Sequence, residues 1–120
     1  MAFLGLKGPY SLDKATIDRN FTRTSPGNYA LISVSDEAII TVFYIGRADQ
    51  DLNARLNEWV GKEAKHTHFK ADYASSVKDA FEKECQIYHE FGDSQKLDNV
   101  FHPDRPSGKD WECPVCKIFD

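Results

Sequence analysis

The stretch that decides the fold is residues 27–46, GNYALISVSDEAIITVFYIG. It holds two runs rich in Tyr, Ile, Val, Thr and Phe, residues 28–35 and 38–46, on either side of a polar Asp-Glu pair. Side chains that are β-branched or aromatic favour strands, and a polar break between two such runs is typical of a turn. The stretch therefore predicts a β-hairpin.

Beyond the hairpin, the pattern alternates between helix and strand. Residues 51–61 carry apolar side chains at helical spacing and close on a glycine, which predicts a helix. Residues 65–74 alternate enough to predict a third strand, and a longer helix follows, beginning at Ser75 or Ser76 and ending at Gly92. The order β-β-α-β-α predicts an α+β fold, with a small three-stranded antiparallel sheet flanked by helices.

The chain is expected to form a single domain, residues 1–120, because this length is enough for one core and too short for two. Residues 26–100 are the predicted core, between an N-terminal extension at 1–25 and a C-terminal tail at 101–120. Within the extension, SLDKATIDRN predicts a short helix capped by Ser11. One interpretation of the extension is that it covers an otherwise exposed edge of the sheet.

Charge and cysteine content narrow the class of protein. Lys plus Arg number 15 and Asp plus Glu number 19, a formal charge of −4, so nucleic acid would have to bind at a local basic cleft. No apolar run approaches the roughly 20 residues of a membrane span, and the first residues do not resemble a signal peptide. Three cysteines, an odd number, argue against a disulfide framework and for a reducing compartment. We therefore expect a cytoplasmic protein that is not secreted and has no membrane partner.

Two charged residues interrupt the predicted apolar stripes. Arg55 lies three residues after Leu52, and Glu84 lies three before Ile87, so both are expected on the apolar faces of their helices. A buried charge costs several kcal/mol unless it is paired or coordinated. The two side chains are therefore expected either to line one cleft or to form a structural ion pair with each other.

Several short motifs, taken in order, resemble the GIY-YIG nuclease domain. The tripeptides Gly27-Asn28-Tyr29 and Tyr44-Ile45-Gly46 stand where that family has its two name-giving tripeptides, on neighbouring strands of a three-stranded sheet. The middle residue of the first tripeptide departs from the family pattern. The segments that continue the resemblance are Leu52-x-x-Arg55-Leu56, Asp79-Ala80-x-x-x-Glu84-x-x-Ile87-Tyr88 and Asn99.

The resemblance implies metal-dependent hydrolysis of phosphodiester bonds in nucleic acid, most simply DNA, by an endonuclease. The catalytic residues that it implies are Tyr29, Tyr44, Arg55, Glu84 and Asn99. Glu84 would bind Mg²⁺ or Mn²⁺, and Arg55 would pair with the phosphate oxygens as their charge grows. Tyr29 would be the general base or would position the attacking water.

Substrate contacts and a rival function complete these expectations. Gly46 would let the backbone approach the substrate, and Arg47 and Lys70 would contact phosphate unless they are simply solvated surface. The net negative charge also leaves open a module that keeps the fold, cleaves weakly and binds nucleic acid or a protein partner. An enzyme recruited by a protein partner is a further alternative.

The cysteines raise a separate hypothesis of structural zinc. Cys85 and His89 are four residues apart on the predicted long helix, and Cys113 and Cys116 form a C-x-x-C pair. Together they make a set of three thiolates and one imidazole that suits Zn²⁺, with His102 able to replace His89. The alternative is three reduced cysteines, and a redox role is less favoured. The His66/His68 pair is expected on the surface, with contact to phosphate or metal as the alternative.

Overall fold

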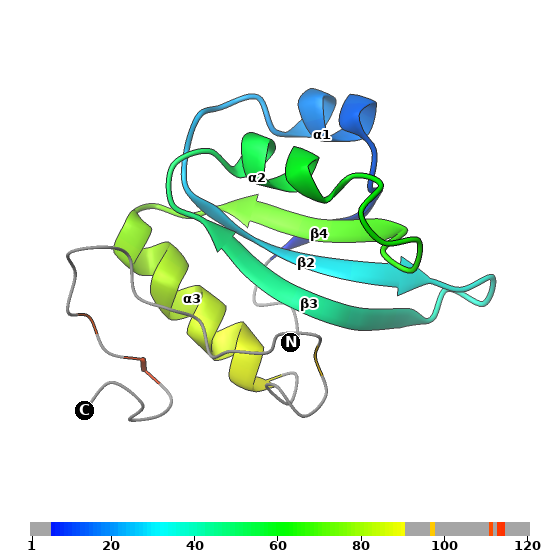
Figure 1. Ribbon diagram of the computed structural model, residues 1–120. Coiled ribbons are helices and arrows are strands. Elements are labelled where there is room, and N and C mark those ends of the chain that lie inside the picture. Colours follow the sequence, from blue (N-terminus) through cyan, green and yellow to red (C-terminus); the bar gives the residue numbers. More distant parts are fainter. Residues whose placement is uncertain (1–5, 91–96, 98–110, 112, 115–120) are drawn as a thin grey trace.

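The computed structural model describes residues 6–90, 97, 111, 113 and 114. They form a small α+β fold in which a four-stranded antiparallel sheet carries helices on both faces (Figure 1). The elements, in chain order, are β1 (Lys7–Ser11), α1 (Lys14–Asn20), β2 (Gly27–Val34), β3 (Ile40–Ala48), α2 (Leu52–Trp59), β4 (His68–Tyr73) and α3 (Val77–Glu90).

The sheet has the strand order β1-β4-β2-β3, so the prediction of three strands is wrong. The fourth strand, β1, comes from the N-terminal extension and pairs antiparallel with β4, with Tyr10 opposite Phe69. It therefore covers an edge of β4 that would otherwise be open, as one interpretation of the extension had it. The pattern missed β1 because the strand is short and largely exposed, and it has no alternating apolar face.

The predicted hairpin is confirmed as β2 and β3. In its register Tyr29 lies opposite Gly46 and Asn28 opposite Arg47. At the turn, Ser35 and Ile39 are hydrogen-bonded through both the backbone and the Ser35 hydroxyl. Since β2 lies between β3 and β4, it is the central strand of the core and β3 is an edge strand.

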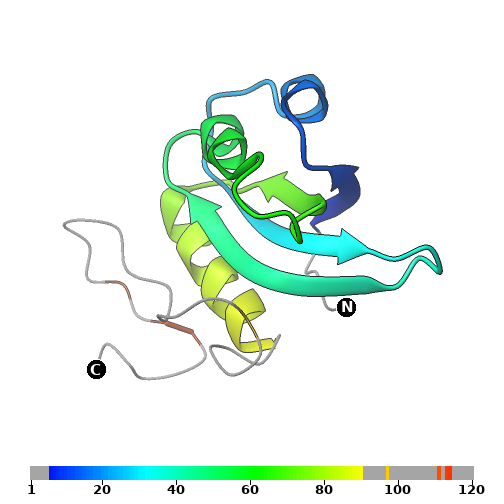
Figure 2. The same cartoon turned by 45° about the vertical axis from the view of Figure 1, so that its right-hand side comes forward.

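Two hydrophobic clusters hold helices against opposite faces of the sheet. Helices α1 and α2 lie together on one face and α3 lies on the other (Figure 2). Because side chains alternate along β2, Tyr29 and Leu31 join the α1/α2 cluster while Ala30 and Ile32 join the α3 cluster. Burial of these two clusters fixes the register of the central strand, because a slip of one residue would exchange its faces.

The helix starts are set by short polar side chains. The Asp13 carboxylate, rather than the predicted Ser11, caps α1 by accepting from Thr16 N at 2.7 Å. Asp51 caps α2, and the Ser76 hydroxyl accepts from Asp79 N at 3.1 Å at the start of α3, as predicted. Across the described residues, the helices are too short and polar to cross a membrane.

Candidate active site at the end of strand β3

The end of edge strand β3 gathers the predicted site residues from four elements. Residues 44 and 46 of this strand face α2, together with Tyr29 of β2, whereas Arg47 faces α3. Arg55 comes from α2 on one side of the sheet and Glu84 from α3 on the other. The two helices thus bring their polar groups to one strand end from opposite faces.

On the α2 side, two tyrosines and a tryptophan form one aromatic group. The Tyr29 ring is 2 % exposed, and its hydroxyl accepts a hydrogen bond from Trp59 Nε1 at 2.8 Å. The Tyr44 ring centroid lies 6.3 Å from that of Tyr29 and 4.8 Å from that of Trp59. The sequence pattern placed Trp59 only in an apolar stripe, and nothing in the spacing indicated its hydrogen bond to Tyr29.

Gly46 is required by the position of the Tyr29 ring. A Cβ atom at Gly46 would lie 2.8 Å from Tyr29 Cε1 and would overlap the Cζ and hydroxyl oxygen of the same phenol. Any side chain there would displace the ring. Gly46 therefore makes room for a tyrosine, whereas the expectation was that it made room for substrate.

On the α3 side, Glu84 is buried as predicted, but its partner is Arg47 and not Arg55. Arg47 Nη1 donates to Glu84 Oε1 at 2.7 Å, and Arg47 Nε donates to Asp49 Oδ1 at 2.7 Å. The side chains of Arg47 and Glu84 are only 11 % and 9 % exposed. Arg47 is therefore no solvated surface residue, and its guanidinium holds two carboxylates at once.

Burial shifts the acid–base properties of this group. It raises the pKa of Glu84 to about 7, against the opposing pull of the Arg47 charge. Burial also favours the neutral form of Arg47, but Asp49 and Glu84 outweigh it and raise the pKa of Arg47. Burial likewise raises the pKa of Tyr29 and of Tyr44, although the positive charge of Arg55 lowers both. Both tyrosines are therefore neutral at physiological pH.

Arg55 lies on the exposed side of α2, so the prediction that it is buried in the apolar stripe is wrong. Its side chain is 49 % exposed and its Nη1 atom lies 3.9 Å from Glu58 Oε1. Leu52 and Leu56 occupy the face of the helix that meets the sheet, and Arg55 stands beside that face. The expected Arg55–Glu84 ion pair does not form, although the Arg55 charge still lowers the pKa of Glu84.

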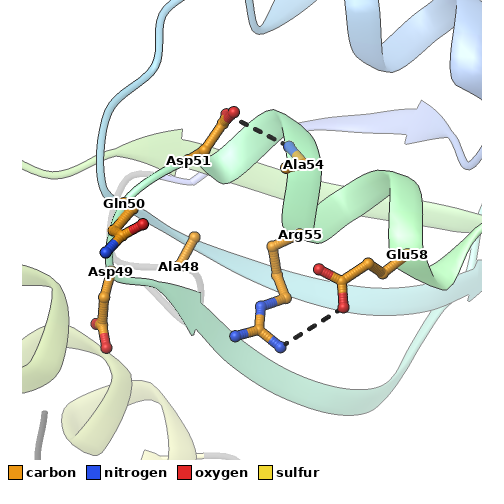
Figure 3. A pocket seen from close by; sticks show the side chains of 7 residues that line it. All are labelled: Ala48, Asp49, Gln50, Asp51, Ala54, Arg55 and Glu58. Atoms are coloured by element: carbon orange, nitrogen blue, oxygen red, sulfur yellow. Dashed lines mark hydrogen bonds and ion pairs between the residues drawn. The ribbon is translucent and has the colours of Figure 1, made fainter. Parts of the chain in front are cut away.

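A pocket of about 340 Å³ opens beside this arginine (Figure 3). Its lining residues are Ala48, Asp49, Gln50, Asp51, Ala54, Arg55 and Glu58. In Figure 3 the Arg55 guanidinium and the Asp49 carboxylate leave their backbones on the same side, so an anion at this pocket would meet one arginine among several carboxylates.

Asn28, which sequence reasoning did not select, connects the two halves of the site. Its side chain is fully buried, and its Nδ2 atom donates to the Ala80 carbonyl at 2.8 Å. This hydrogen bond joins β2 to the first turns of α3, the helix that carries Glu84. The residue that departs from the family tripeptide thus has a structural role in positioning α3.

The remaining predicted residues fall elsewhere. Lys70 lies on β4 opposite Ala30, on the α3 face of the sheet, and is half-buried. The surface prediction for His66 is wrong, because its ring is buried beside those of Phe43 and Trp59. Asn99 lies outside the described residues.

The predicted zinc ligands are partly brought together. Cys85 and Cys113 are both buried in one cluster with Phe81, whereas His89 is only half-buried. Cys116 and His102 lie outside the described residues. Within the described part of the chain, no three His, Cys, Asp or Glu side chains gather closely enough to hold a metal ion.

Comparisons with family models, with curated proteins and with solved structures gave no match to this chain.

Proposed function

We propose that the protein is a small metal-dependent endonuclease of the GIY-YIG type that hydrolyses phosphodiester bonds, with DNA as its substrate. The observation that carries the proposal is the convergence of Tyr29, Tyr44, Arg55 and Glu84 at one strand end. These residues come from four elements, and the charge of Arg55 lowers the pKa of the other three. The resemblance in the sequence supplies the reaction class.

The acidic groups of the site have the oxygen chemistry that a divalent cation prefers, although the Arg47 guanidinium binds them both. Glu84 offers a buried carboxylate, and Asp49 offers a second one on the far side of the Arg47 guanidinium. The guanidinium thus already supplies the positive charge that these carboxylates require. Mg²⁺ or Mn²⁺ would be held by Glu84 with water and phosphate oxygens, and it would stabilise charge on the phosphate and lower the pKa of water.

Three side chains of the protein would then bind the phosphate or orient the attacking water. Arg55 is exposed beside the pocket and carries the positive charge that would pair with a non-bridging phosphate oxygen. The Tyr29 hydroxyl, held by Trp59, would orient the attacking water, and Tyr44 would orient the water or the phosphate. Because both phenols are neutral at physiological pH, neither is expected to accept the proton unless further positive charge enters the site.

Further contacts would come from outside this group. Lys70 would reach phosphate only on the α3 face of the sheet, so its role would be with a flanking nucleotide. Asn99 is expected to brace the site by hydrogen bonds.

A second candidate is a binding module that cleaves weakly, and the Arg47–Glu84 ion pair favours it. The cation that holds Glu84 is part of the protein itself, and metal binding must compete with it. The net charge of −4 also disfavours strong binding to nucleic acid without a recruiting protein partner.

Cleavage of supercoiled plasmid, single-stranded DNA and RNA with Mg²⁺ or Mn²⁺ tests the proposal. Glu84→Gln is expected to abolish nicking, and Arg55→Ala to reduce it by about 10²-fold or more. The matched controls are Glu90→Gln, an exposed glutamate on the same helix, and Arg19→Ala, an exposed arginine on α1; both should nick at the native rate. Circular dichroism would show that all four variants are folded.

The outcomes separate the two candidates. Nicking that survives Glu84→Gln, or that the controls lose equally, would refute the nuclease site. No cleavage of any substrate, combined with salt-sensitive binding of labelled DNA that Arg55→Ala weakens, would identify the binding module instead.

A further inference from the structure

A second pocket, also of about 340 Å³, opens at the C-terminal end of α2. Its lining residues are Tyr44, Trp59, Glu63, Lys65 and His66, and it shares none of them with the pocket of Figure 3. Ligand pockets commonly measure about 300–1,000 Å³, so this one has room for a single ring system and not for a large cofactor. The reaction proposed above assigns no ligand to this pocket.

The pocket is built largely from aromatic rings held in fixed positions. The Trp59 ring centroid lies 4.8 Å from that of Tyr44 and 5.9 Å from that of His66. Phe43 packs against the His66 ring, with centroids 5.6 Å apart, and the indole is fixed further by its hydrogen bond to Tyr29. A planar ligand can therefore stack here without first ordering the rings, which lowers the entropic cost of binding.

Two exposed lysines lie over these rings. Lys62 Nζ is 5.8 Å from the Trp59 ring centroid, and Lys65 Nζ is 4.9 Å from that of Phe43. Since Lys62 is itself exposed, it can leave the indole when a ligand arrives, and this face of the ring is accessible from solvent. The two ammonium groups would then stand at the rim of the pocket, where they can pair with an anion.

Glu63 decides which part of a ligand enters the pocket. Its carboxylate lies 3.9 Å from Lys65 Nζ and 3.8 Å from His66 Nε2. A carboxylate repels a phosphate, but it accepts a hydrogen bond from an amino group on the edge of a base. The chemistry of the pocket thus favours a planar ring with N–H donors inside and negative charge outside, at the lysines.

Stacking rings beside lysines are the features of a nucleotide site. Aromatic faces bind bases by stacking with little regard to sequence, and lysines bind the adjoining phosphates. We propose that this pocket binds one unstacked base of the nucleic-acid substrate on the Trp59 ring, with a neighbouring phosphate on Lys62 and Lys65. The inference rests on the proposed function. It also narrows the substrate, because a base can enter the pocket only where the strand is unpaired.

The position of the pocket relates it to the candidate active site. Arg55 and Trp59 are four residues apart on α2, so their side chains lie on the same side of the helix, with Cβ atoms about 5–6 Å apart. A base on Trp59 would therefore belong to a nucleotide that adjoins the phosphate bound by Arg55. The substrate that we expect is a single strand, or a duplex with an unpaired nucleotide next to the cleaved bond.

Binding of labelled single-stranded DNA, with chelator present to prevent cleavage, tests the proposal. Trp59→Leu is expected to weaken this binding by about 5- to 150-fold, the contribution of one stacked base, and to leave binding of the matching duplex nearly unchanged. Trp59→Phe keeps a ring in the pocket but loses the hydrogen bond to Tyr29, so it should keep most of the affinity. The single strand should also quench the fluorescence of the wild type more than that of Trp59→Phe, whose only tryptophan is Trp111.

The charged rim needs its own variants. Lys62→Gln and Lys65→Gln should each weaken binding of the single strand and reduce the slope of log K against log salt by about 0.7, the value for one phosphate. The matched control is Lys14→Gln, an exposed lysine on α1, which should change neither the affinity nor the slope. Circular dichroism would show that all the variants are folded.

The outcomes separate this inference from the proposed function. Equal losses for Trp59→Leu and Trp59→Phe would overturn the base site, because the indole would then act only through its hydrogen bond to Tyr29. Unchanged binding by Trp59→Leu, with a wild type that nicks DNA, would overturn the base site alone. A wild type that neither binds nor cleaves any oligonucleotide would overturn both.

Discussion

Removing Arg47 should destabilise the protein much more at pH 8 than at pH 5. Arg47→Met keeps most of the side-chain volume and removes the positive partner of Glu84, whose carboxylate is almost fully buried. Breaking a buried ion pair from one side typically costs about 3–5 kcal/mol, because the remaining charge has lost its compensation. Glu84 can avoid most of this cost by binding a proton, and its pKa of about 7 already favours that at low pH.

The expected magnitudes follow from the protonation state. At pH 5 Glu84 is neutral with or without Arg47, so the loss is limited to hydrogen bonds and packing, about 1 kcal/mol. At pH 8 the native carboxylate is charged and paired, and the variant must leave it unpaired or protonate it. From a pKa of about 7, protonation at pH 8 adds about 1.4 kcal/mol, so the total loss is about 2.5 kcal/mol. Glu84→Gln should cost about 1 kcal/mol at pH 5 and should be neutral or stabilising at pH 8, where the native protein has lost most of the stability linked to the raised pKa of Glu84. Its amide oxygen can still accept from Arg47, and Asp49 still compensates the guanidinium.

Urea unfolding followed by tryptophan fluorescence, with chelator present, measures these differences. Arg55→Ala is the matched control, since its side chain is half exposed and should change stability little at either pH. Equal losses for Arg47→Met at pH 5 and pH 8 would refute the reasoning, as would a larger loss for Glu84→Gln than for Arg47→Met.

Three further predictions concern the same site. Gly46→Ala should cost about 1–3 kcal/mol of unfolding free energy, because its Cβ would overlap the Tyr29 ring. The control is Gly61→Asn, which should cost little, because a Cβ there meets no atom and the left-handed backbone suits asparagine. Similar losses for the two variants would contradict the packing argument. Tyr29→Phe keeps the ring but removes the acceptor of the Trp59 hydrogen bond, so it should cost about 1 kcal/mol in stability. It should also lower the rate of the proposed nicking by about 10²-fold. A full nicking rate would exclude the hydroxyl from the reaction. The folded pKa of Glu84 lies above its ordinary 4.5, so the stability that this residue contributes is complete below about pH 4.5 and is lost as pH rises through about 7. The loss in unfolding free energy should reach about 3 kcal/mol. A pH series of urea midpoints, with chelator present, should show this slope in the native protein and not in Glu84→Gln.

The sequence pattern predicted the parts of the fold that depend on regular spacing. The hairpin of β2 and β3, the two flanking helices and the Ser76 cap follow from apolar periodicity and from local hydrogen bonding. Burial of Glu84 was also predictable, because it stands between Ala80 and Ile87 on a long apolar face. Strand β1 was not predictable, since its five residues place only Tyr10 against the core and its pairing with β4 is a backbone ladder that leaves no apolar pattern in the sequence.

The site was less predictable because its partners are distant in the sequence. Arg47 and Glu84 are 37 residues apart and lie on a strand and a helix. Helical spacing drew attention only to charged residues on predicted helices, so it suggested Arg55 as the partner. The burial predicted for Arg55 was wrong because α2 is only eight residues long and packs on the sheet through Leu52 and Leu56. Arg55 stands beside these leucines and therefore meets solvent. The hydrogen bond from Trp59 to Tyr29 depends likewise on how α2 packs on the sheet.

A side chain at residue 46 would overlap the ring of Tyr29, so residues of the two tripeptides of the hairpin constrain each other sterically. A large ring at residue 29 is acceptable only with glycine at residue 46, so the two positions should not vary independently. In a library randomised at residues 29 and 46, folded members with a large ring at 29 should keep glycine at 46. Members with alanine or serine at 46 should carry a smaller residue at 29.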